Sequence, residues 1–348
     1  MKKYSWDTED IKYKYFAQKR IVNAAHLRSK NEYSNEKNRL RALNELYADI
    51  GLKSIITNRE PSNFSPFFTI EDAKKAFKIY NTSYQKDFIT IAYDRTLECD
   101  LNGYDSKTPH KFFPTGISLD FAGKVFTDLD GSKDDFKILK NNTNNNLRIS
   151  PFHKSYFIPA VNDFYISVTE RRNIKSFQSL VHELGHYYQF YLDKNEYRNK
   201  PDNYINYSEI TSLLFEHLGI DKLTKYGIIT EDEKKSLFEN SFLVNSDKVI
   251  NYLEMLDIVS SDNINLKDKL FIMNNKQTIF DITYFFSYVI AINFYEQFIK
   301  DEKQALNNLK RLLLLYSKED EIDLLEKCEI DLDGEVLKKH LDNLKRSN

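Results

Sequence analysis

The sequence predicts a mainly helical protein with a small β-sheet in its middle third. All seven prolines lie at or before Pro201, and three of the nine glycines follow it, so the rest of the 348-residue chain contains few helix breakers. Prolines and glycines punctuate short segments between residues 109 and 131, and FYISVT at 164–169 has the aromatic and β-branched content of a strand. We therefore expect a small sheet followed by long helices.

The remaining elements are expected to be helical. The first 50 residues have the composition of a helical hairpin, and the proline-punctuated stretch NREPSNFSPFF at 58–68 follows them. We therefore expect a helical appendage at 1–60 and one large domain at 61–348. Near the C-terminus, apolar spacing predicts helices over 302–317 and 320–328.

Composition and charge exclude several classes of partner. The 50 basic and 52 acidic residues are spread along the chain, which predicts neither nucleic-acid nor membrane binding. The two cysteines, Cys99 and Cys328, are far apart in sequence, and the N-terminus becomes charged before any apolar core develops, so we expect a cytoplasmic protein. No phosphate-binding glycine motif occurs. No feature indicates an oligomeric state.

The segment IKSFQSLVHELGHYYQFYL at 174–192 contains the residues that indicate chemistry. His182 and His186 are four residues apart, so on a helix both imidazoles project from one side and can bind one metal ion. Glu183 lies beside them without being a ligand. A carboxylate in that position can act as the general base on a zinc-bound water whose pKa is lowered to roughly 7.

A catalytic zinc needs a third protein ligand, and the best candidate is Glu209. Gln189 and Leu192 stand where a metzincin has glycine and histidine, which excludes that class. The stretch 206–219 predicts a second helix that ends near Gly219 and has Glu209 in its first turn, where the helix dipole favours a carboxylate. Glu196 is the competing candidate, but it lies in a polar loop.

Two further residues of the second helix need interpretation. Glu216 is two turns beyond Glu209, and its carboxylate is predicted to accept a hydrogen bond from a ligand imidazole or from a neighbouring backbone group. His217 projects about 100° away round the helix, so it is interpreted as structural or exposed, as are the other four histidines. The sequence thus predicts one Zn²⁺ per chain, although this ligand set also accepts cobalt or manganese.

These residues resemble the oligoendopeptidase F and thimet oligopeptidase family of zinc metallopeptidases. HELGH at 182–186, followed by EITSLLFE at 209–216, is similar to the family's zinc helix and second helix, and weaker likeness extends over roughly 70–345. The resemblance implies a zincin-type, mainly α fold with a small sheet beside an active-site cleft. It also implies an endopeptidase that hydrolyses short peptides, with 61–348 as the catalytic domain.

The same resemblance suggests roles for two tyrosines in YFFSY at 284–288. Tyr288 is expected to stabilise the carbonyl oxyanion, and Tyr284 is the second candidate, expected to bind substrate. Two departures from the family stand out: 274–283 contains no histidine before the tyrosines, and from its length we expect this sequence to lack most of the family's N-terminal lobe. They favour an alternative hypothesis, a zinc-binding but catalytically weak peptide-binding or regulatory protein of the same fold.

Overall fold

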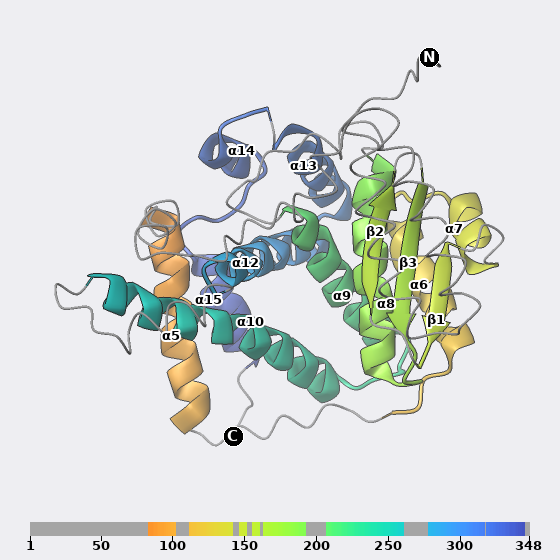
Figure 1. Cartoon of the computed structure of the whole chain (residues 1–348), viewed down its shortest axis with the longest axis horizontal. Helices are drawn as coiled ribbons and strands as arrows, with labels where there is room; N and C mark the ends of the chain where they lie inside the picture. Colours follow the sequence, from red (N-terminus) through yellow and green to blue (C-terminus); the bar gives the residue numbers. More distant parts are fainter. Residues whose placement is uncertain are drawn as a thin grey trace, which may run out of the picture. The chain divides into compact units, whose positions relative to one another are not determined.

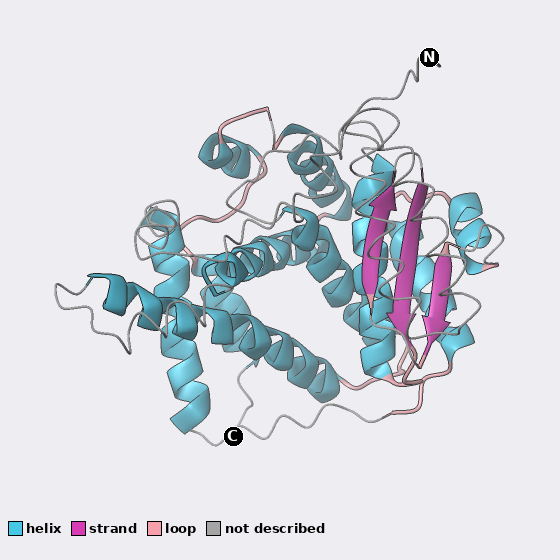
Figure 2. Cartoon of the chain, in the orientation of Figure 1, coloured by secondary structure: helices cyan, strands magenta, loops and turns pink. Residues whose placement is uncertain are grey.

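The computed structural model describes residues 83–101, 111–141, 146–151, 155–160, 163–192, 207–260, 278–316 and 318–344. Within these ranges the chain is mostly helical and has one three-stranded sheet, which confirms the predicted fold class (Figure 2). The appendage predicted at 1–60 and its boundary lie outside the described residues. The described chain divides into two compact units, one within Phe112–Tyr187 and the other comprising α5 and the residues from Tyr188 onward.

The first unit contains the sheet and the helices around it. Its elements are α6 (Thr115–Asp128), α7 (Lys133–Lys140), β1 (Leu147–Ser150), β2 (Tyr156–Ala160), β3 (Asp163–Thr169) and most of α8 (Ile174–Leu192). The strand order is β1-β3-β2, with β1 parallel and β2 antiparallel to β3 (Figure 1). The predicted strand at 164–169 is therefore confirmed as the central strand of this sheet.

Aromatic side chains attach α6 and α8 to the sheet. Tyr187 of α8 lies against Phe164 of β3, with ring centroids 4.4 Å apart, and stacks on Phe126 of α6 at 5.5 Å. Tyr187 and Phe126 are both buried, so these contacts remove much aromatic surface from water. The packing fixes the orientation of α8 relative to the strands.

The start of α8 is set by a polar cap. Asn173 Oδ1 accepts a hydrogen bond from the backbone N–H of Ser176 at 3.1 Å, which satisfies one of the free donors of the first turn. The backbone of Phe113 donates to the carbonyl of Arg172, at 2.8 Å, and ties the entry of α8 to the segment before α6. The register of the helix that contains HELGH is thereby fixed at its first turn.

The second unit is a helical assembly. Its elements are α5 (Ser83–Leu101), the end of α8, α9 (Tyr207–Lys225), α10 (Glu231–Ser260), α12 (Thr278–Lys300), α13 (Glu302–Leu315), α14 (Glu321–Lys327) and α15 (Glu335–Leu344). The central helix is α12, which packs along α9 and also contacts α10, α13 and α15. Its residues from Ile282 to Tyr295 are buried except Tyr284, which is half-buried. The long helices predicted after Pro201 are confirmed.

The predicted end of the second helix near Gly219 is wrong. Gly219 is buried inside α9, which continues to Lys225. The chain reverses two residues after the helix, at Gly227, whose φ is 69°. There the N–H of Gly227 donates to Thr224 O at 2.8 Å, and that of Ile228 donates to Leu223 O at 2.9 Å. Glycine ends a helix where it adopts a left-handed conformation, and Gly219 is instead accommodated within the helix.

None of the helices that the structure describes is long and apolar enough to cross a membrane.

Candidate metal centre

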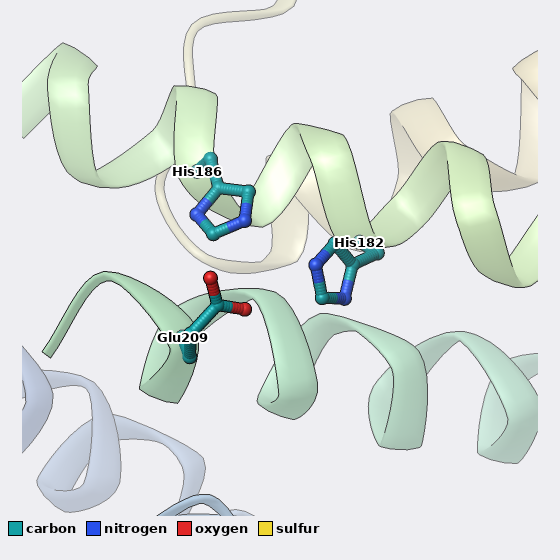
Figure 3. Close-up of side chains that lie close together, drawn as sticks. All are labelled: His182, His186 and Glu209. Atoms are coloured by element: carbon teal, nitrogen blue, oxygen red, sulfur yellow. The ribbon is translucent and has the colours of Figure 1, made fainter. Parts of the chain in front are cut away.

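The three predicted metal ligands lie close together in the structure. His182 and His186 lie one turn apart on α8, with ring centroids 4.9 Å apart and planes at 82°. Potential ligand atoms of His182, His186 and Glu209 all lie within 4.8 Å of one another. Figure 3 shows the two imidazoles and the Glu209 carboxylate pointing toward one another from α8 and α9. Two imidazole nitrogens and one carboxylate oxygen are the donor set of a catalytic zinc site, so these residues fit that metal.

Two of the three candidate ligands are buried. His186 is 9% exposed and Glu209 is 5% exposed, while His182 is half-buried. The ring of Phe157 on β2 stacks on His186, at 6.1 Å between centroids and 24° between planes. An ionised carboxylate this deeply buried is costly unless polar groups or a metal compensate its charge. His182 is therefore the most accessible of the three candidate ligands.

Two hydroxyl groups hold the Glu209 carboxylate. Tyr284 of α12 donates to Glu209 Oε1 at 2.9 Å. Ser212, one turn further along α9, donates to Glu209 Oε2 at 3.1 Å. Ser212 Oγ also lies 3.0 Å from the backbone carbonyl oxygen of Glu209, so its one proton is shared between two acceptors. Because hydrogen bonds to an ionised acceptor are stronger than those between neutral groups, the Tyr284 hydroxyl is the firmer donor to the carboxylate.

Glu183 is buried on α8, with 4% of its surface exposed. It follows His182 directly, so its side chain leaves the helix about 100° round from that imidazole. Two carboxylates are thus buried here: Glu209, which is a candidate ligand, and Glu183, which is next to the candidate ligand His182 in the sequence.

The two predicted tyrosines have different surroundings. Tyr288 is fully buried, and its ring lies 5.6 Å from that of His217 and 6.4 Å from that of Phe242. Its hydroxyl has no hydrogen-bond partner among the described residues. Burial raises the pKa of the Tyr288 hydroxyl, and the charge of Glu216 raises it further. Tyr284 is therefore hydrogen-bonded to the candidate ligand Glu209, whereas Tyr288 lies in the core.

The other predicted site residues are placed as follows. Glu216 is half-buried on α9, close enough to Tyr288 to influence its ionisation, and its predicted contact with a ligand group stays a prediction. Glu196 lies outside the described residues. His217 is fully buried and its Nδ1 lies 2.8 Å from Leu213 O, so of its two predicted environments the structural one is confirmed and the exposed one is wrong. His340 is also buried, 2.9 Å from Glu296 Oε1.

Sequence reasoning missed two residues near these ligands. Phe157 stacks on His186, and Lys248 of α10 places its ammonium 4.3 Å from the centre of the Tyr284 ring. Both come from elements distant in sequence from the ligands they support. Local sequence patterns predict helices and strands but do not identify which side chains of distant elements will meet.

Comparisons with known proteins show what this arrangement resembles. No protein-family model matches the sequence, and no curated protein is significantly similar to it. Among solved structures, a candidate peptidase from Chlamydophila abortus superimposes with a TM-score of 0.56 at 15% identity, over 78% of this chain and 57% of that one. A candidate oligoendopeptidase F from Bacillus anthracis gives a TM-score of 0.55 at 12% identity, over 97% of this chain and 72% of that one.

This chain has the fold of the oligoendopeptidase F-type peptidases. An inhibitor-bound PZ peptidase A is similar in the same way, with a TM-score of 0.50, 12% identity, and coverage of 95% of this chain and 70% of that one. The chain spans little more than half the length of the Chlamydophila protein. Mainly helical architecture with a small sheet, expected from the resemblance in sequence, is thus shared with solved peptidases.

Proposed function

We propose that this protein is a zinc-dependent endopeptidase that hydrolyses short peptides. The observation that carries the proposal is the convergence of His182, His186 and Glu209 within 4.8 Å, with the buried Glu183 adjoining them. The peptidase fold of the structural neighbours supports it. A cytoplasmic location belongs to the same proposal, because the two cysteines are far apart in sequence.

The metal would be held by the two imidazoles and the carboxylate. A zinc ion so bound supplies Lewis-acid chemistry, which polarises a carbonyl group and lowers the pKa of a water molecule to roughly 7. Zinc is favoured over calcium or magnesium because two of the three ligand atoms are imidazole nitrogens. One ion per chain is expected, since the described residues contain one such group.

Glu183 moves the proton in this proposal. Its carboxylate accepts a proton from the attacking water as the oxygen bonds to the peptide carbonyl carbon. It then delivers that proton to the amide nitrogen, and the carbon–nitrogen bond breaks to release the amine. Burial of Glu183 at 4% exposure keeps bulk water from competing for this proton.

The test compares wild-type protein with Glu183→Gln, which preserves shape but removes the base. We expect equal zinc content in both, with cleavage of a mixed library of short peptides reduced at least about 100-fold in the variant. Glu302→Gln is the matched control, because Glu302 is exposed at the start of α13. Two outcomes would contradict the proposal: equal cleavage by wild type and Glu183→Gln, or purified wild type that contains no metal.

One alternative is a zinc-binding, catalytically weak protein that binds peptides or regulates a partner. The absence of histidine from 274–283, just before Tyr284, favours it. Under this alternative the wild type contains zinc and binds peptides, yet cleaves them no faster than Glu183→Gln does. The buried Glu183 argues for the enzyme, because a binding protein needs no base beside its metal.

A further inference from the structure

The Glu209 carboxylate is oriented by groups from other parts of the second unit. Tyr284 Oη donates to one carboxylate oxygen at 2.9 Å, and Ser212 Oγ donates to the other at 3.1 Å. The two donors come from different helices, α12 and α9. Ser212 Oγ also lies 3.0 Å from the backbone carbonyl oxygen of Glu209 and has one proton to share, so the Tyr284 hydrogen bond is the main restraint on rotation of the carboxylate about its terminal bond.

Lys248 supports the tyrosine from its other side. Its ammonium lies 4.3 Å from the centroid of the Tyr284 ring, which is cation–π distance. Asn245, one turn earlier on α10, accepts a hydrogen bond from the same ammonium at 3.1 Å. A cation over the face of a phenol withdraws electron density from the ring, so the hydroxyl becomes a stronger donor.

These contacts form one chain of interactions across three helices. It runs from Lys248 on α10 through Tyr284 on α12 to Glu209 on α9. Each member polarises the next in the same direction, with positive charge at one end and the buried carboxylate at the other. Such alignment strengthens a hydrogen bond in surroundings of low dielectric constant.

We propose that Tyr284 and Lys248 are positioning residues for the metal ligand Glu209, and that Tyr284 supports metal binding rather than substrate binding. The inference rests on the proposed function, because it assumes that Glu209 binds the metal. It replaces the substrate-binding role that resemblance suggests for Tyr284. Residues that orient metal ligands typically contribute about 10–100-fold to metal affinity.

The expected effects differ between the two residues. Tyr284→Phe removes a hydrogen bond to the ligand itself, so zinc should bind about 10–100-fold more weakly. Lys248→Met keeps an apolar stem but removes the charge, and zinc should bind about 2–5-fold more weakly. Because the lysine acts through the ring hydroxyl, adding Lys248→Met to Tyr284→Phe should cost no further affinity.

The experiment measures zinc dissociation constants for full-length wild type and these variants by competition with a chelator. Tyr93→Phe is the matched control, since Tyr93 is 39% exposed on α5. Visible absorption of the cobalt-loaded proteins supplies a second measurement, because cobalt bands report ligand geometry. Tyr284→Phe should shift these bands, whereas Tyr93→Phe should leave them unchanged.

Several outcomes separate this inference from the proposed function. If Tyr284→Phe binds zinc within twofold of wild type and only KM for peptides rises, the tyrosine binds substrate and the inference is wrong. Additive losses in the double variant would overturn the role of Lys248. Wild type that binds zinc but cleaves no peptide contradicts the proposed catalysis alone, and weaker zinc binding by Tyr284→Phe then still supports the inference. Wild type that binds no metal overturns both.

Discussion

Replacing Tyr288 with phenylalanine tests whether its hydroxyl has any function in the folded protein. The side chain is fully buried, and its hydroxyl has no partner among the described residues. An unsatisfied buried hydroxyl costs about 1–3 kcal/mol of stability, whereas the void left by one oxygen atom costs less than about 1 kcal/mol. Tyr288→Phe should therefore increase the free energy of unfolding by about 1 kcal/mol.

Urea unfolding at constant pH, with the slope m compared between proteins, provides the measurement. Tyr284→Phe gives a contrast on the same helix: it removes a hydrogen bond to a buried carboxylate and should lower stability by about 1.5–3 kcal/mol in metal-free protein. A loss of 1 kcal/mol or more in Tyr288→Phe would refute the reasoning, since it would show that the hydroxyl is satisfied. A loss in kcat of about 100-fold or more would instead support the oxyanion role that resemblance suggests for Tyr288.

Two further predictions concern pH and the end of α9. Burial lowers the pKa of the His217 imidazole from its ordinary value of about 6.5 to about 3, and the charge of His340 contributes to the lowering. The neutral imidazole therefore stabilises the fold; this stability is complete above about pH 6.5 and is lost as the pH falls toward 3. The free energy of unfolding of wild type should fall by up to about 1.4 kcal/mol per pH unit more steeply than that of His217→Gln between about pH 6 and 4, and equal slopes would contradict this. Gly227→Ala should lower stability by about 1 kcal/mol because its φ is 69°. Gly116→Ala, in α6, is the control and should be neutral or stabilising, since a methyl group there meets nothing within 4 Å.

Local patterns in the sequence predicted much of the fold. The scarcity of proline and glycine after Pro201 predicted the helices from α9 onward, and the residues of FYISVT predicted the strand at 164–169. These predictions succeed because helix and strand depend mainly on neighbouring residues. Gly219 misled the same reasoning, since glycine ends a helix through its backbone conformation, which its identity alone does not reveal.

The sequence by itself determined the identity and spacing of the candidate ligands. Two histidines four residues apart must share one side of a helix, and an acidic residue in the first turn of the next helix is electrostatically favoured. Only the tertiary structure decided which groups support them. The contacts of Tyr284, Lys248 and Phe157 join elements separated by many residues, and packing between elements selects such partners. Tyr284 and Tyr288 belong to the same short motif, yet packing half-buries the first beside Glu209 and encloses the second in the core.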